Sequence, residues 1–149
     1  MYYGALEAGG TKMVCAIGDA DKNIIDRISI PTGTPDQSVP AMIDYFKKYD
    51  ISALGIGTFG PADINPNSPT YGSIMRSPKK DWEGFSLYKA FTDALGCLVV
   101  VDTDVNAAAW GEYLYGALKG LNSGMYLTVG TGIGGGIMRD IMAVEIPYV

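Results

Sequence analysis

Glu7-Ala8-Gly9-Gly10-Thr11-Lys12 is a glycine turn between two apolar segments, residues 2–6 and 13–17. Apolar segments on either side of paired glycines predict two antiparallel strands joined by a tight hairpin. Glycine has no side chain, so a phosphate oxygen can approach the backbone N–H groups of such a turn closely. The pattern alone is equally typical of a hairpin that binds nothing, because paired glycines are common in turns.

A second glycine turn lies near the other end of the chain. Gly130-Thr131-Gly132-Ile133-Gly134-Gly135-Gly136 follows a strand predicted at residues 125–129 and precedes another predicted from residue 137. Each turn contains a threonine hydroxyl, and the first ends in Lys12. Two such turns favour the hypothesis that both bind one polyphosphate. Neither is a P-loop or a dinucleotide-binding fingerprint, since no helix pattern follows either glycine cluster.

The composition is that of an ordinary globular protein. The 149 residues are 48% hydrophobic and 18% charged, and 11 basic against 16 acidic side chains give a net charge of −5. No Lys or Arg run is longer than a pair, so we expect no nucleic-acid partner. No apolar run approaches the ~20 residues needed to cross a bilayer, and we therefore expect no membrane partner and a cytoplasmic location.

The sequence contains no histidine. Ser-His and Cys-His catalysis and histidine-bound metal ions are therefore excluded within these residues, and carboxylates must carry any proton chemistry. Cys15 and Cys97 stand singly in apolar segments, which predicts two buried, inert thiols rather than a disulfide or a metal site.

The order of the elements predicts an α/β fold. Strands are expected at 2–6, 12–17 and 24–30 as an antiparallel meander, then a helix at 36–49 capped by Asp36 or Ser38, and a strand at 53–58. A long loop at 62–83 is followed by a helix at 87–95, a strand at 97–101 and a helix at 104–118.

A carboxylate follows the last of these strands in Val101-Asp102-Thr103-Asp104-Val105-Asn106. In α/β sheets ligands bind where a strand ends and a helix begins, so Asp104 is expected at the mouth of a crevice. Asp102 and Thr103 are better explained as helix caps. A carboxylate here could take the proton from a hydroxyl that attacks a γ-phosphate, which predicts a phosphotransferase acting on an alcohol.

Four segments in this order resemble the ROK family of sugar kinases, which has the actin-like, hexokinase-like ATPase fold with a ribonuclease H-like lobe. They are Glu7-Ala8-Gly9-Gly10-Thr11-Lys12, Gly55-Ile56-Gly57-Thr58-Phe59-Gly60-Pro61-Ala62-Asp63, Asp104-Val105-Asn106-Ala107-Ala108-Ala109 and the second glycine turn. Three features are similar to sequences of the fructokinase-like branch of the family: Glu7, Thr103, and Ser77-Pro78-Lys79 followed by Trp82.

The resemblance implies a role for each motif. Asp104 would be the general base for a hexose hydroxyl, and Glu7 would reach Mg²⁺ through water, with ATP as the phosphate donor. The implied ATP-binding residues are Gly9, Gly10, Thr11, Lys12, Gly130, Thr131, Gly132 and Gly134. The implied sugar-binding residues are Gly60, Pro61, Lys79, Trp82, Thr103 and Asn106.

The resemblance also implies an incomplete fold. We expect residues 1–119 to form the N-terminal lobe and residues 120–149 to open the C-terminal lobe. Its remainder, with the adenine pocket and a structural Zn²⁺ site of one His and three Cys, has no counterpart in this sequence. This predicts a truncated, inactive fragment of a fructokinase-like enzyme.

A non-catalytic sugar- or phosphate-binding module is the alternative. Fructose, mannose, glucose and acylated amino sugars all stay open as the hexose, and a homodimer stays open as the assembly.

Overall fold

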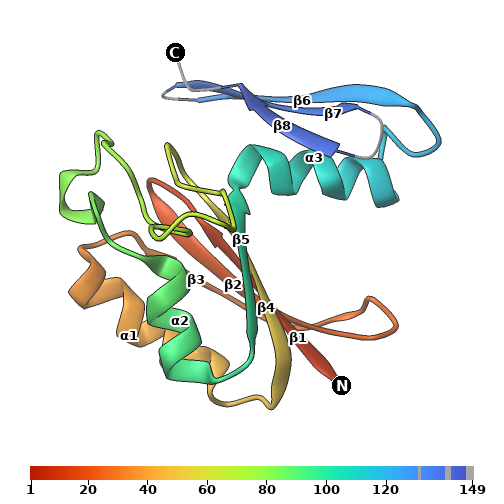
Figure 1. The fold of residues 1–149 in the computed structure, drawn as a ribbon. Helices are drawn as coiled ribbons and strands as arrows, with labels where there is room; N and C mark the ends of the chain where they lie inside the picture. Colours follow the sequence, from red (N-terminus) through yellow and green to blue (C-terminus); the bar gives the residue numbers. More distant parts are fainter. Residues whose placement is uncertain (131, 140–141, 147–149) are drawn as a thin grey trace.

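The computed structural model describes residues 1–130, 132–139 and 142–146, which form two sheets on either side of one helix (Figure 1). The larger sheet has the strand order β3-β2-β1-β4-β5 and the smaller one the order β6-β7-β8. The strands of the larger sheet are β1 (Tyr2–Ala8), β2 (Lys12–Asp19), β3 (Ile24–Pro31), β4 (Ile51–Thr58) and β5 (Leu98–Thr103). Those of the smaller sheet are β6 (Ser123–Val129), β7 (Ile133–Arg139) and β8 (Met142–Ile146).

The larger sheet combines an antiparallel meander with parallel crossovers. β1, β2 and β3 pair antiparallel, whereas β4 pairs parallel to β1 and β5 parallel to β4. The two parallel pairings require crossover connections, and each of these contains a helix. The predicted α/β fold and its opening meander are therefore confirmed, with strand bounds that differ from the prediction by a few residues at most.

Helices α1 (Pro35–Phe46) and α2 (Leu87–Leu95) lie together on one face of this sheet (Figure 1). Alternate residues of the strands turn toward them, as the burial of Leu6 and Ala8 and the exposure of Glu7 in β1 illustrate. Phe46 of α1 and Phe91 of α2 are fully buried there, with ring centroids 6.1 Å apart in an edge-to-face arrangement. Their contact anchors the helix layer on the core.

Two predictions for α1 are wrong. The N-cap residue is Thr34, whose backbone N donates to Oε1 of Gln37 at 3.2 Å, so neither Asp36 nor Ser38 caps the helix. The helix also ends at Phe46 rather than at residue 49. The backbone N of Tyr49 donates to the carbonyl of Phe46 instead, which is the tighter turn that often closes a helix.

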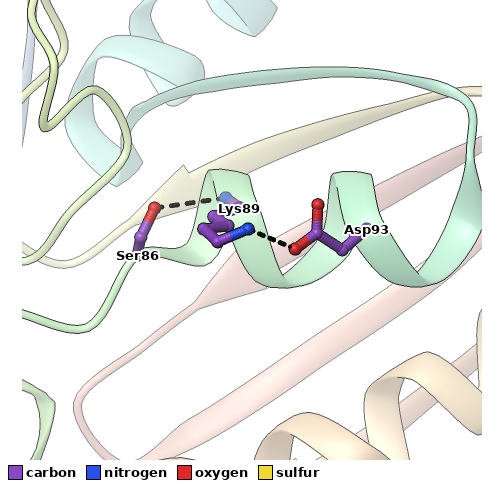
Figure 2. Close-up of polar contacts among 3 residues, drawn as sticks. All are labelled: Ser86, Lys89 and Asp93. Carbon is purple, nitrogen blue, oxygen red and sulfur yellow. Dashed lines mark hydrogen bonds and ion pairs between the residues drawn. The ribbon is translucent and has the colours of Figure 1, made fainter.

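Helix α2 has the predicted bounds because both of its ends carry local signals. Ser86 is the N-cap, and its hydroxyl accepts a hydrogen bond from the backbone N of Lys89 at 3.1 Å (Figure 2). Lys89 in turn forms an ion pair with Asp93 at 2.6 Å, one helical turn further on (Figure 2). Gly96 ends the helix in the left-handed conformation, with φ of 65°.

The long loop predicted at residues 62–83 is confirmed, with a single 3₁₀ turn at Lys80–Trp82. Asp63 organises its first part by accepting hydrogen bonds from the backbone N of Asn65 and the hydroxyls of Ser68 and Thr70. These donors hold the pKa of the Asp63 carboxyl below its usual value. Trp82 closes the loop against the core and is only 1% exposed.

Helix α3 (Asp104–Tyr115) follows β5 directly and carries the smaller sheet on its far side (Figure 1). It ends three residues earlier than predicted, because the chain leaves the helix at Gly116. Within the part of the chain that the structure describes, no helix is both long enough and apolar enough to cross a membrane.

Candidate functional site

Three parallel strands end at the same edge of the larger sheet and bring distant segments together there. In the strand register, Glu7 of β1 lies opposite Gly57 of β4, which lies opposite Asp102 of β5. Since adjacent strands are about 5 Å apart, the backbones of Glu7 and Asp102 are separated by about 10 Å. Each strand then runs into a segment that the sequence singled out: the first glycine turn, Phe59-Gly60-Pro61, or the start of α3.

A cavity of about 630 Å³ lies over this row, on the sheet face opposite α1 and α2. Three carboxylates line it, those of Glu7, Asp102 and Asp104, and the rest of its lining is mainly small or apolar. Gly57 is essential to its shape, because a Cβ atom there would lie 2.9 Å from Cβ of Ala107 and push α3 away from the sheet. The predicted crevice at Asp104 is therefore present.

The start of α3 is fixed by hydrogen bonds around Asp104. Thr103 is the N-cap, and its hydroxyl accepts from the backbone N of Asn106 at 3.4 Å. The carboxylate of Asp104 accepts from the backbone N of Val105 at 2.9 Å. Asp102 Oδ1 accepts from Thr103 N at 2.7 Å and from Asn106 Nδ2 at 2.8 Å. The predicted capping by Thr103 is confirmed, and Asp102 acts as a second clamp on the same turn.

Thr103 and Asn106 were expected to contact the sugar, but both are fully buried. Asn106 Oδ1 has no hydrogen-bond partner among the described residues, although its neighbour Nδ2 is bonded to Asp102. A buried carbonyl oxygen without a donor is uncommon in proteins. In this arrangement the two side chains hold the helix start that presents Asp104.

The first glycine turn is a tight hairpin braced from outside. The backbone N of Gly9 donates to the carbonyl of Lys12 at 3.0 Å, and a Cβ atom on Gly9 would lie 2.7 Å from that oxygen. Thr32 holds the turn through two hydrogen bonds. Its hydroxyl donates to the carbonyl of Gly9 at 2.7 Å, and its backbone N donates to the carbonyl of Thr11 at 3.0 Å. The side chains of Thr11 and Lys12 are exposed. Nothing in the sequence around Thr32 indicated this bracing role.

The second glycine turn is shorter than predicted. Gly130 and Gly132 form the turn between β6 and β7, with Gly130 N donating to Gly132 O at 2.9 Å, and Thr131 lies outside the described residues. Gly134 is not in the turn: it pairs with Thr128 within β7, which begins at Ile133 rather than at residue 137. Residues 134–136 belong to a strand because they pair with β6, and this strand lies close against α3.

The contact between β7 and α3 shows how close this approach is. A Cβ atom on Gly136 would lie 2.3 Å from the carbonyl oxygen of Val105 and 3.1 Å from Cβ of Ala109. Only a residue without a side chain allows the backbones to meet in this way. The β6–β7 hairpin consequently lies directly over α3 (Figure 1).

The expected sugar-side residues divide into two groups. Gly60 is half-buried and Pro61 exposed, and their segment is tied to the end of β1 by a 2.7 Å bond from Phe59 N to Ala8 O. Trp82 is instead enclosed in the core, where its indole N–H donates to the carbonyl of Gly33 at 2.9 Å. Lys79 extends to the first glycine turn: its Cε atom lies 3.8 Å from where a Cβ would stand on Gly10.

A dedicated metal cage is not found in the described residues, where no three or more Asp, Glu, Cys or His side chains are grouped to hold an ion. Mg²⁺ commonly keeps most of its water and binds through one or two carboxylates and the phosphates of a substrate. Glu7 is exposed on the cavity wall. Its carboxylate fits an ion held mainly by a polyphosphate and water.

Comparison with known proteins finds relatives along most of the chain. The model of the ROK family matches residues 3–144. A Bacillus subtilis (strain 168) protein is 48% identical over 137 residues, which are 92% of this chain and 46% of that protein. The fructokinase of Pediococcus pentosaceus is 44% identical over 140 residues, 94% of this chain and 49% of that enzyme.

A solved structure has the same fold. The ROK family glucokinase from Streptomyces griseus in complex with glucose and AMPPNP aligns with a TM-score of 0.82 and 29% identity, over 99% of this chain and 47% of that one. The actin-like, hexokinase-like fold expected from the resemblance is thereby confirmed. The chain spans about half the length of the relatives that it matches.

Proposed function

Since this chain belongs to the ROK family, we propose that it is the part of an ATP-dependent hexose kinase that carries the general base and the first phosphate-binding turn. One observation carries the proposal: Asp104 lines a cavity at the sheet edge where β1 leads into that turn. A proton acceptor and a set of phosphate-binding amides on one rigid edge are what transfer of a phosphoryl group to an alcohol requires.

The reaction follows from the chemistry of these groups. The Asp104 carboxylate takes the proton of the hexose 6-hydroxyl as the oxygen attacks the γ-phosphorus of ATP. The new O–P bond forms while the bond to the β-phosphate oxygen breaks, which gives the hexose 6-phosphate and ADP. The start of α3 is clamped by Thr103 and Asp102, so the carboxylate stays in position during the transfer.

Glycine turns and Mg²⁺ would share the phosphate charge. Gly9, Gly10, Thr11 and Lys12 would bind the polyphosphate from one side, and Gly130 and Gly132 from the smaller sheet. Glu7 would help to hold Mg²⁺, which would supply positive charge against the phosphates. The Streptomyces griseus glucokinase, whose structure contains an ATP analogue and glucose, supports ATP as the donor and a hexose as the acceptor.

Fructose is the hexose that we assign. The support is sequence identity: the Pediococcus pentosaceus fructokinase is 44% identical, whereas the Streptomyces coelicolor glucokinase is 36% identical. The fructokinase is about twice as long as this chain. We therefore expect little turnover from the 149-residue polypeptide alone, since half of such an enzyme would be missing around the substrates.

The experiment combines binding and turnover. Calorimetry measures fructose, glucose and mannose binding to the 149-residue chain, and a coupled ADP-release assay follows turnover with and without the second half of the Pediococcus pentosaceus fructokinase in trans. We expect fructose binding by the chain alone and turnover only in the complemented mixture. Asp104→Asn should remove that turnover, whereas Asp93→Asn, in an exposed ion pair on α2, should keep it.

The outcomes separate the alternatives. Rapid fructose-dependent ADP release by the chain alone would refute the incomplete-enzyme proposal. Fructose binding without turnover in the complemented mixture would favour a non-catalytic sugar-binding module. Turnover that survives Asp104→Asn would remove this carboxylate as the base.

A further inference from the structure

Lys79 lies at the first glycine turn although it comes from the long loop. Its Cε atom is 3.8 Å from the position that a Cβ would occupy on Gly10, so the ammonium-bearing end of the side chain is beside the turn. The side chain is exposed, and it forms no ion pair with the residues that the structure describes. An exposed cation beside a glycine turn, without an ion-pair partner among the described residues, is suited to an anionic ligand.

Two hydrogen bonds in series hold the loop of Lys79 against this turn. The indole N–H of Trp82 donates to the carbonyl of Gly33 at 2.9 Å, and the neighbouring Thr32 donates to the carbonyl of Gly9 at 2.7 Å. Trp82 is joined to Lys79 by a 3.0 Å bond from its backbone N to the Lys79 carbonyl. Because Trp82 is 1% exposed, this connection is anchored in the core.

We propose that Lys79 is a phosphate-binding residue of the nucleotide site, and that Trp82 positions it. The ammonium group would bind a terminal phosphate of a polyphosphate held at the Gly10–Thr11 part of the turn, since the Gly9 amide is already bonded to the Lys12 carbonyl. This assignment rests on the proposed kinase function and replaces the sugar contact expected for Lys79 and Trp82. The sugar would then lie in the cavity at Asp104, close to the end of β4.

The test uses the 149-residue chain and sodium tripolyphosphate as the probe. Titrations are followed by the backbone amide NMR signals of Gly9, Gly10 and Thr11, and fructose is titrated separately. Lys79→Gln should weaken tripolyphosphate binding about fivefold, the effect of losing one exposed charge-assisted contact. It should leave the fructose affinity unchanged, and it should lower the dependence of the tripolyphosphate affinity on salt concentration.

Matched variants distinguish binding from folding. Lys80→Gln removes an exposed neighbouring charge and should change tripolyphosphate affinity less than twofold. Lys79→Arg should restore most of the lost affinity because it restores the charge. Trp82→Phe keeps an aromatic ring in the core but removes the bond to Gly33. It should weaken tripolyphosphate binding and leave the fructose affinity unchanged.

Each result decides between the two proposals. If Lys79→Gln weakens fructose binding and leaves tripolyphosphate binding intact, Lys79 is a sugar contact and this inference is overturned while the kinase proposal stands. If Lys80→Gln has the same effect as Lys79→Gln, the effect is one of general charge, and the specific role is overturned. If tripolyphosphate leaves the turn amides of the unmodified chain unmoved, both the phosphate-binding turn and the role of Lys79 fail.

Discussion

The side-chain amide of Asn106 donates a hydrogen bond to the carboxylate of Asp102 at 2.8 Å across the start of α3. Asp104 lies between these two residues in the sequence, in the first turn of the helix. The same Asp102 oxygen accepts from the backbone N of Thr103 at 2.7 Å. The proposed general base therefore sits on a backbone segment clamped from both sides.

Removing this clamp should destabilise the protein. Asn106 is fully buried, so Asn106→Ala removes a buried hydrogen bond and should lower the free energy of unfolding by about 1–3 kcal/mol. Urea unfolding followed by circular dichroism measures the change. Asp93→Asn is the control, since its exposed ion pair should contribute under about 1 kcal/mol. Equal effects of the two variants would show that the clamp has no special role.

Two glycines near α3 should respond to alanine in opposite directions. At Gly136 the added Cβ would lie 2.3 Å from the backbone carbonyl of Val105, so Gly136→Ala should separate β7 from α3 and cost about 1–3 kcal/mol. At Gly111, within α3, no atom lies within 4 Å of the new Cβ. Gly111→Ala should therefore stabilise the helix by about 0.5–1 kcal/mol. Midpoints of thermal unfolding test both, and the same sign for both would contradict this packing.

The pair of Asp26 and Tyr49 should contribute to stability in a pH-dependent way. The Tyr49 hydroxyl donates to Asp26 at 2.6 Å, and this bond holds the pKa of the Asp26 carboxyl below its usual value. A lowered pKa in the folded state stabilises the protein above about pH 4, the pKa of an unfolded aspartate, and this contribution is lost as the pH falls through the folded value.

Tyr49→Phe removes the donor and should make stability less sensitive to acid. The measurement is the urea midpoint from pH 6 down to pH 2, compared between the variant and the unmodified chain. Some acid sensitivity should persist in the variant, because hydrogen bonds also lower the pKa of Asp19 and Asp63. Parallel curves for the two proteins would exclude a contribution from this pair.

The two thiols should differ in reactivity. Cys15 is fully buried, and burial raises the pKa of its thiol to about 12. Cys97 is only half-buried, so the prediction of two buried thiols is wrong for this residue. Burial nevertheless raises the pKa of its thiol as well. In a Cys97→Ser variant at pH 8, the remaining thiol should react with Ellman's reagent only as fast as the protein unfolds.

The contribution of Cys15 to stability has a defined pH window. Because its folded-state pKa is raised, its contribution is complete below about pH 8.5, the pKa of an unfolded cysteine, and is lost as the pH rises toward 12. Rapid reaction of the Cys97→Ser variant in the absence of denaturant would mean that Cys15 is accessible in the native state.

Sequence reasoning succeeded where the deciding signal is local. The bounds of α2 follow from Ser86 and Gly96, which cap its two ends. The crevice at Asp104 follows from the position of a polar segment directly after a buried strand. The same reasoning was wrong at the second glycine cluster, where Gly134 and Gly136 resemble turn residues but lie in a strand. Their place in β7 is set by pairing with β6 and by packing against α3, which no local pattern encodes.

The amino-acid sequence alone determined the order of strands and helices, the family and the candidate base, because periodicity, caps and motifs are properties of neighbouring residues. The tertiary structure alone decided that Lys79 reaches Gly10, that Trp82 bonds to Gly33 and that Gly136 touches Val105. Each of these pairs joins segments far apart in the chain. Their contacts exist only because the parallel strands and α3 pack in one arrangement, in which burial of apolar side chains favours the whole set of contacts together.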